Sequence, residues 1–328
     1  MARRKYWQGV NRALIELMDD DERVMIMGAD VGVSGGTFGA TRGLQARFGS
    51  KRVRDMPISE EAIVGAGIGL ALGGLRPIVE VLYQDFLMLA LEPLVNQAAS
   101  RPYLTRSGDA VPLVIKTGSG IGSGLGTHHG QSWEAWVAGV PGLKVVWPSN
   151  VADAAGLLKA AVLDPGPVVF YETLSAYGAV GELDDGPIEP IPIGRGAIVC
   201  EGDDVLLVTY GSAVPVVLEA AESLARDGVH AAVVDLRSIS PWDEDLVTGL
   251  ARTIGRAVVV TDAVDPFGPA AEIAAKVTER CWGALGAPVA RVTSRPYPPP
   301  HVRRYEATRR PTVERIRRAV SDVGVSVG

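Results

Sequence analysis

The residue with the strongest case for chemistry is Glu60, which together with Glu61 stands between the segment at residues 54–59 and the Gly-rich apolar run AIVGAGIGLALGGL. A carboxylate at the mouth of a nearly uncharged helix is costly unless it has a partner, and removal from water strengthens its hydrogen bonds. Glu60 can therefore share a proton with a ring nitrogen of a bound heterocycle. A second interpretation is structural, because Ser59 can cap the helix while Glu60 and Glu61 favour its positive end. The spacing alone leaves both interpretations open.

A second candidate for chemistry is the segment GSGIGSGLGTHHGQSWEAW, which has five glycines between residues 118 and 126 and then His128 and His129. The Gly-x-Gly-x-x-Gly matches within it do not indicate a dinucleotide site. Such a site needs a preceding strand, a following helix and an acid about 20 residues further on, whereas this run leads into the two histidines. An isolated histidine pair is more often exposed or satisfied in a core than catalytic. An imidazole can nevertheless move protons near neutral pH.

Composition predicts a globular protein of about two domains and excludes several functions. The chain has 328 residues, 47% of them apolar, a net charge of −6 and a pI near 5.4, which argues against nucleic acid as a partner. Cys200 and Cys281 form neither a disulfide framework nor a metal-ligand cluster, which favours a cytoplasmic location. The first residues lack the apolar core of a signal peptide. The longest apolar run, residues 62–75, is shorter than the roughly 20 residues that span a bilayer, so no membrane partner is expected.

Short apolar runs rich in β-branched residues alternate with helical patterns, which is typical of parallel sheets covered on both faces. In the first half we expect strands at 24–27, 77–82, 113–116, 143–146 and 168–171, and helices near 6–18, 60–73, 86–101 and 151–163. In the second half we expect strands at 205–210, 231–236, 257–261 and 289–293, and helices near 213–227, 243–253, 269–284 and 311–322. The sequence therefore predicts two doubly wound α/β domains, residues 1–178 and 196–328, joined by a Pro-rich and acidic linker at 179–195.

Several segments together resemble one enzyme family across nearly the whole chain. The segments RVRDMPISEEAIVGAGIGLALGGLRPIVE, GADVGVSGGTFGATRGLQARFGSKRV, GLRPIVEVLYQDFLMLALEPLVNQAA and GTHHGQ carry the resemblance. They are similar to the beta subunit of thiamine-diphosphate-dependent 2-oxo acid dehydrogenases, in the transketolase-like superfamily. The resemblance implies a pyrimidine-binding module followed by a transketolase C-terminal-like domain.

The resemblance also implies roles for individual residues. Glu60 would hydrogen-bond N1′ of the thiamine aminopyrimidine and so activate the cofactor, with Ile58 counted among the cofactor-binding residues. Phe86, 26 positions after Glu60, would place its ring over the pyrimidine, although without the resemblance it would be taken for a core aromatic. Glu80 would be a partner of the residues that contact the cofactor, or would be a charge at a strand end. His129 would handle protons and the incoming acyl acceptor. His128 would support the active-site residues without itself contacting the substrate.

One motif of the family is absent from the sequence, namely the Gly-Asp-Gly and Asn-Asn pair that holds Mg²⁺ on the cofactor diphosphate. Magnesium needs hard oxygen ligands in octahedral geometry, so the resemblance implies an alpha subunit that supplies them in an α₂β₂ heterotetramer. Several relatives also hold K⁺ through backbone carbonyls. The matching turn here comprises Ala161, Val162, Asp164 and Gly166, although a plain helix-to-strand turn accounts for these residues as well.

The expected function is that of a beta subunit that works in the decarboxylation of a 2-oxo acid and in transfer of the acyl unit to a lipoyl group on an acyltransferase partner. Ala29 and Arg295 stand where relatives carry acids, which keeps an alternative open. In that alternative the chain is part of a split transketolase-like enzyme that transfers a two-carbon unit to an acyl carrier protein or a sugar. A non-catalytic regulatory or scaffold subunit is a third interpretation, since fold alone does not give function.

Overall fold

The computed structural model describes residues 2–106 and 108–327 and divides them into two compact units. The first unit comprises the described residues of 1–120 together with 136–193, and the second comprises 121–135 together with the described residues of 194–328. The loop that carries His128 and His129 therefore groups with the second unit, although it lies within the first predicted domain. The predicted linker contains a short strand, β8 (Val180–Leu183), which pairs with β1 (Ala2–Lys5) in antiparallel fashion.

The first unit is built on a parallel sheet with the strand order β6-β7-β5-β4-β2-β3. Its strands are β2 (Val24–Gly28), β3 (Val53–Asp55), β4 (Arg76–Leu82), β5 (Val114–Ser119), β6 (Lys144–Val146) and β7 (Val168–Thr173). β2, β5 and β7 are buried along their whole length, as expected for a sheet covered on both faces.

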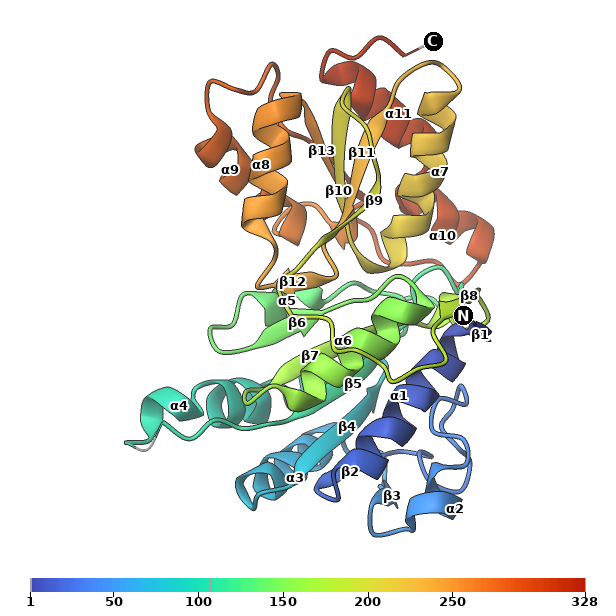
Figure 1. The fold of residues 1–328 in the computed structure, drawn as a ribbon, viewed down its shortest axis with the longest axis vertical. Coiled ribbons are helices and arrows are strands. Elements are labelled where there is room, and N and C mark those ends of the chain that lie inside the picture. The colour runs from blue at the N-terminus through green and yellow to red at the C-terminus, as the bar shows by residue number, and fades with distance from the viewer. Residues whose placement is uncertain (1, 107, 328) are drawn as a thin grey trace. The chain divides into compact units, whose positions relative to one another are not determined.

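Helices cover both faces of this sheet (Figure 1). α1 (Tyr6–Asp20) and α6 (Val151–Leu163) pack against each other, while α3 (Glu60–Leu72) packs on β4. α3 also contacts the short 3₁₀ helix η1 (Gln84–Ala90) and the π-helical turn η2 (Pro93–Ala99), which is followed by α4 (Arg101–Leu104). The remaining short helices of this unit are α2 (Leu44–Phe48) and η3 (Leu174–Ala176), and α5 (Glu134–Ala138) crosses the boundary between the two units.

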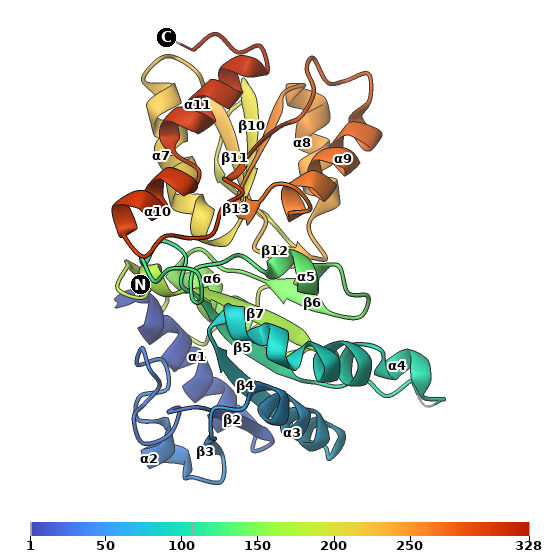
Figure 2. The same cartoon turned by 180° about the vertical axis from the view of Figure 1, so that it is seen from behind.

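The second unit has a five-stranded sheet with the order β14-β13-β10-β11-β9, in which β9 runs antiparallel to its neighbour. The strands are β9 (Ala197–Cys200), β10 (Val205–Thr209), β11 (Ala231–Asp235), β13 (Ala257–Val264) and β14 (Ala290–Ser294). α7 (Val214–Ala225) and α11 (Val313–Asp322) lie together on one face, and α8 (Glu244–Ile254) and α9 (Pro269–Cys281) lie on the other (Figures 1 and 2). Shorter elements are η4 (Gly211–Ala213), β12 (Ser238–Ser240) and α10 (Arg303–Arg309).

The prediction of two doubly wound α/β units is confirmed. The predicted helix at 86–101 is instead divided among η1, η2 and α4, because Pro93 and Pro102 each lack the amide hydrogen that a continuous helix needs. Among the described residues, none of the helices combines the length and the apolar character needed to cross a lipid bilayer.

Candidate functional site

Glu60 is the first residue of α3 and is half-buried. The Ser59 side chain does not cap this helix, so the capping role considered for Ser59 is not seen. Within the described part of the chain, no ion pair neutralises the Glu60 carboxylate. Ile58, two residues earlier, is 83% exposed. The start of α3 thus presents a carboxylate that lacks a cationic partner beside a large exposed apolar side chain, which suits a flat, polar-edged heterocycle.

Phe86 lies in η1, an element that contacts α3, and its ring is half-buried. It meets the Tyr83 ring edge to face, with centroids 6.4 Å apart. The aromatic contacts continue from Tyr83 to Phe38 at 6.2 Å and from Phe38 to Tyr177 at 5.7 Å. Phe86 is therefore part of an aromatic row in the first unit, and its half-buried ring lies outside the fully buried core.

Glu80 lies inside β4 and is buried, and its carboxylate accepts a hydrogen bond of 2.7 Å from Nζ of Lys116 on β5. Lys116 also pairs with Glu172 on β7, whose carboxylate accepts a 2.7 Å bond from the Tyr177 hydroxyl. Burial by itself would lower the pKa of the Lys116 ammonium, but Glu172 and Glu80 together raise that pKa well above its ordinary value. Glu80 is thus held by an internal charge network, and its predicted contribution to the cofactor site stays a prediction.

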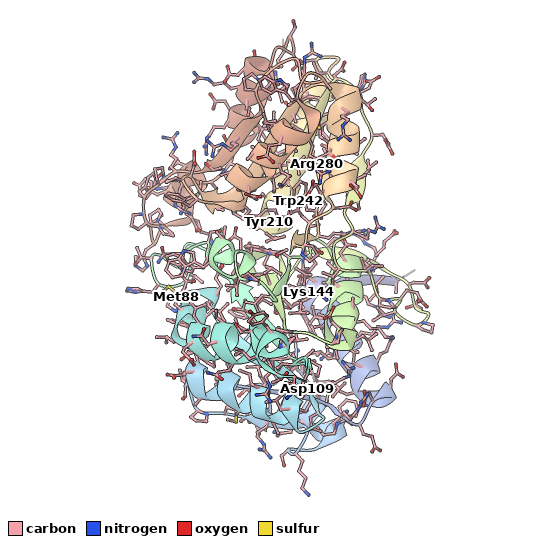
Figure 3. The ribbon with its side chains drawn as sticks, turned by 90° about the vertical axis from the view of Figure 1, so that its left-hand side faces the viewer. Met88, Asp109, Lys144, Tyr210, Trp242 and Arg280 are labelled. Carbon is pink, nitrogen blue, oxygen red and sulfur yellow. The ribbon has the colours of Figure 1, made fainter. Side chains whose placement is uncertain are left out.

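The two histidines differ in exposure, since His128 is exposed and His129 is half-buried. The His129 amide donates to the Gly126 carbonyl at 3.4 Å, which turns the loop back on itself. At the far end of this loop Glu134 is fully buried and accepts hydrogen bonds from Ser132 Oγ at 2.6 Å and from the Tyr210 hydroxyl at 2.9 Å. Tyr210, labelled in Figure 3, directly follows β10.

A second charge network lies beside this tyrosine in the second unit. Arg310 donates to both oxygens of Asp262, at 2.8 and 2.7 Å, and Ser212 Oγ donates to Asp262 at 2.6 Å. Although burial would raise the pKa of the Asp262 carboxyl, Arg310 holds that pKa below its ordinary value. Sequence reasoning did not single out Lys116, Glu134, Asp262 or the buried Glu306 on α10. Lys116 and Asp262 each carry a signal, as a lone charge inside an apolar strand run.

The described residues contain no group of three or more His, Cys, Asp or Glu side chains placed to hold a metal ion. The turn predicted to bind K⁺ is already contacted by two cationic side chains. Arg76 Nη1 donates to the Val162 carbonyl at 2.7 Å, and Lys144 Nζ pairs with the Asp164 carboxylate at 2.5 Å.

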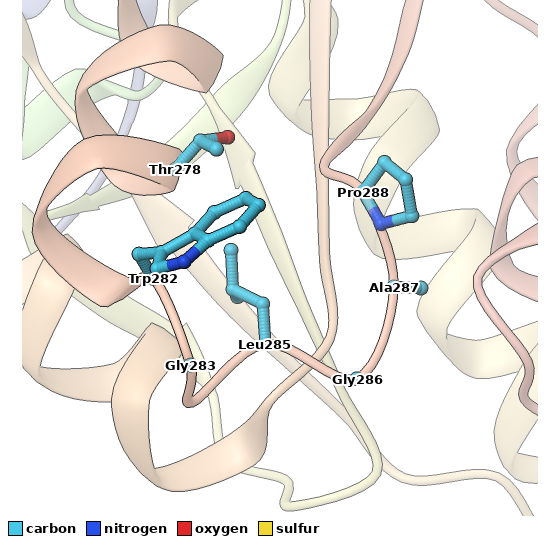
Figure 4. Close-up of a pocket in the computed structure, with 7 residues that line it drawn as sticks. All are labelled: Thr278, Trp282, Gly283, Leu285, Gly286, Ala287 and Pro288. Atoms are coloured by element: carbon cyan, nitrogen blue, oxygen red, sulfur yellow. The ribbon is translucent and has the colours of Figure 1, made fainter.

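An apolar cavity of about 460 Å³ lies in the second unit, between the C-terminal end of α9 and the loop that leads to β14 (Figure 4). Its lining includes the exposed indole of Trp282, with the Leu285 side chain pointing toward it. None of the seven residues that line it is titratable, so it offers no group for acid–base chemistry.

Comparison with known proteins gives matches over both units. The transketolase pyrimidine-binding domain matches residues 3–179, and the transketolase C-terminal domain matches residues 194–316. The 2-oxoisovalerate dehydrogenase subunit beta of Bacillus subtilis (strain 168) is 41% identical over 302 residues, which cover 90% of this chain and 91% of that protein. The mitochondrial pyruvate dehydrogenase E1 component subunit beta-1 of Arabidopsis thaliana is 39% identical, over 94% of this chain and 86% of that one.

Solved structures show the same fold. A split gene transketolase, described as an inactive beta4 tetramer, superposes with a TM-score of 0.78 over 97% of both chains, at 23% identity. A transketolase from Leishmania mexicana gives a TM-score of 0.73 at 19% identity, and this chain corresponds to 47% of its length. At these identities the likeness concerns the fold alone.

Proposed function

Because the chain belongs to the transketolase-like family of 2-oxo acid dehydrogenase beta subunits, which depend on thiamine diphosphate, we propose that it works in a heteromeric enzyme that decarboxylates a 2-oxo acid. The acyl unit would pass to a lipoyl group on an acyltransferase partner. The observation that carries this proposal is 41% identity to a named beta subunit over nine-tenths of both chains.

Glu60 and Phe86 are proposed to hold the aminopyrimidine of the cofactor. When bound, thiamine diphosphate supplies the electron sink that decarboxylation requires. Glu60 would hydrogen-bond the ring nitrogen N1′, and its lack of an ion-pair partner in the described chain leaves it available for that bond. Phe86 would stack on the ring, with Ile58 covering an apolar edge.

The diphosphate and its Mg²⁺ are proposed to be held by an alpha subunit in an α₂β₂ assembly. Support comes from the missing Gly-Asp-Gly and Asn-Asn motif and from the lack of a metal-ligating cluster in residues 2–106 and 108–327. The K⁺ site at the turn 161–166 stays a prediction, since Arg76 contacts one carbonyl of the turn, that of Val162, and Lys144 contacts the Asp164 side chain. Equal thermal stability in sodium and potassium buffers would remove it.

His129 is proposed to assist transfer of the acyl unit to its acceptor. Its half-buried position combines access to solvent with a fixed backbone, and an imidazole can give or take a proton at working pH. Assays with a lipoyl domain, an acyl carrier protein and ketose phosphates separate the dehydrogenase from a split transketolase.

The test of the proposed function is Glu60→Gln in the chain co-expressed with its alpha partner. Loss of the proton-sharing carboxylate should reduce 2-oxo acid turnover by about 10²- to 10⁴-fold. Glu61→Gln, one position along and exposed, is the matched control and should keep wild-type turnover. Unchanged turnover in Glu60→Gln would remove the assignment.

A further inference from the structure

A buried carboxylate on α10 holds the loop that carries His129. Glu306 is 1% exposed, and its two oxygens accept from two backbone amides of the loop, Gly122 N at 2.7 Å and Gly124 N at 2.6 Å. Hydrogen bonds from amides to an ionised carboxylate are stronger than neutral ones. Glu306 thus binds alternate amides of one loop through both of its oxygens.

The loop lies against the segment 299–306 with no room for a side chain at Gly124 or Gly126. A Cβ at Gly124 would come within 2.9 Å of the Arg303 backbone nitrogen, and one at Gly126 would come within 2.3 Å of the His301 ring. Both glycines have positive φ, 71° and 78°, which L-residues with side chains rarely adopt. A Cβ at Gly130, next to His129, would lie 3.6 Å from Glu306 Oε1. The carboxylate is therefore adjacent to the turn that contains His129.

The other end of the loop is also fixed by a buried carboxylate. Glu134 accepts from Ser132 Oγ and from the Tyr210 hydroxyl, as described above. His129 therefore lies between two anchors, with Glu306 holding the residues before it and Glu134 the residues after it. Both anchors belong to the same compact unit as the loop.

We propose that Glu306 is a positioning residue, which sets the place of His129 and thereby the rate of acyl transfer to the lipoyl acceptor. The inference rests on the role proposed above for His129. A carboxylate is required because two amides must be accepted at once. A glutamine offers one acceptor oxygen, and its NH₂ group would face the second amide donor to donor.

The experiment compares Glu306→Gln, Glu306→Asp, His129→Ala and the double variant Glu306→Gln/His129→Ala in the assembled enzyme. Two rates are measured: 2-oxo acid oxidation with an artificial electron acceptor, and acyl transfer to a lipoyl domain. Glu306→Gln should slow transfer by about 10- to 100-fold, as expected for a misplaced group. The artificial-acceptor rate and the KM for the 2-oxo acid should stay at wild-type values. Glu279→Gln, which removes a carboxylate that is 68% exposed on α9, is the control.

A second measurement follows the loop directly. Hydrogen exchange at the Gly122 and Gly124 amides should become faster in Glu306→Gln than in wild type or Glu279→Gln. Glu306→Asp keeps two acceptor oxygens and should recover part of the transfer rate, and it carries the test if the glutamine variant does not fold. The double variant should be no slower than His129→Ala alone, because both changes act on one group.

Three outcomes would overturn the inference. Glu306→Gln with wild-type transfer would remove the positioning role, and so would equal slowing of both rates. Unchanged transfer in His129→Ala would refute the role of His129 and the inference with it. In that last case the Glu60 assignment is unaffected, since the artificial-acceptor rate tests it separately.

Discussion

The surroundings of the Phe86 ring decide whether it is expected to stabilise the fold or to bind a ligand. A ring in a central core stabilises the fold, whereas the Phe86 ring is half-buried and keeps exposed surface for a ligand. Stacking of an aromatic ring on a flat heterocycle contributes roughly 0.5–1.5 kcal/mol beyond the area buried.

Replacing Phe86 by leucine should therefore weaken cofactor binding more than it weakens the fold. We expect the Kd for thiamine diphosphate in the assembled enzyme to rise by about two- to twelvefold, the factor that this stacking free energy gives. Isothermal titration measures it, with Phe48→Leu on α2 as the control. A wild-type Kd in Phe86→Leu would show that the ring does not stack on the cofactor.

Sequence patterns identify a site residue only when its partners leave a pattern as well. Glu60 stands out because an acid opens an apolar helix, and His129 because it follows a glycine run. Glu306 escapes such reasoning because it bonds backbone amides, which every residue type provides. Glu134 and Tyr210 escape it because they are 76 positions apart, and only the fold brings them together.

At the scale of elements, α3 carries Glu60 on a helix whose glycines have unequal surroundings. A Cβ at Gly65 would meet nothing within 4 Å, whereas one at Gly67 would come 2.6 Å from Val79 Cγ2 on β4. The first glycine only weakens the helix, while the second allows α3 to approach the sheet closely.

The two glycines should therefore respond oppositely to alanine. Gly65→Ala should stabilise the chain by about 0.5–1 kcal/mol through helix propensity, and Gly67→Ala should destabilise it by about 1–3 kcal/mol through overpacking. Urea unfolding of the two variants beside wild type measures both free energies. If both substitutions shifted the midpoint in the same direction, the packing of α3 on β4 described here would be wrong.

Another prediction at this scale concerns the buried Glu134 on α5. Burial raises the pKa of the Glu134 carboxyl above its ordinary value, even though Ser132 and Tyr210 donate to it. Between the ordinary and the raised pKa the native state binds the proton more tightly than the unfolded state. The contribution of Glu134 to the free energy of unfolding is therefore lost as pH rises through that window.

Glu134→Gln keeps an acceptor for Tyr210 and removes the titrating proton. We expect the melting temperature of Glu134→Gln, relative to that of wild type, to increase as pH rises from the ordinary carboxyl pKa toward neutrality. Calorimetry across that range measures the difference, and Glu219→Gln, an exposed acid on α7, should show no such trend. A constant difference between Glu134→Gln and wild type would mean that Glu134 does not titrate differently in the folded chain.

The sequence predicts elements best where one pattern dominates a run. The apolar β-branched runs of β7 and β10 predict buried strands, because each strand is covered on both faces. The short elements β1 and β8 are not predicted, because each is stable only through pairing with a partner about 180 positions away. The helix expected at 86–101 is divided because Pro93 lies within it and Pro102 directly follows it. The apolar pattern of this run by itself predicts a continuous helix.

At the scale of the whole molecule, this chain holds only part of what its proposed cofactor requires. The start of α3 offers a carboxylate and apolar surface for a heterocycle, while the described residues offer no acidic cluster for a metal ion. A magnesium diphosphate needs several oxygen ligands and charge-assisted hydrogen bonds, each worth about 1.5–3 kcal/mol. Those contacts must come from the alpha subunit if the proposed function is right.

The chain alone should therefore bind magnesium thiamine diphosphate at least about 100-fold more weakly than the assembled enzyme, since two missing charge-assisted contacts already account for that factor. Isothermal titration of the purified chain, before and after addition of the alpha subunit, measures both affinities, and circular dichroism checks that the isolated chain is folded. Mg²⁺ should add nothing to the affinity of the isolated chain, because its ligands are on the partner. Tight, magnesium-dependent binding by this chain alone would place the metal ligands here and remove the reason for an alpha subunit.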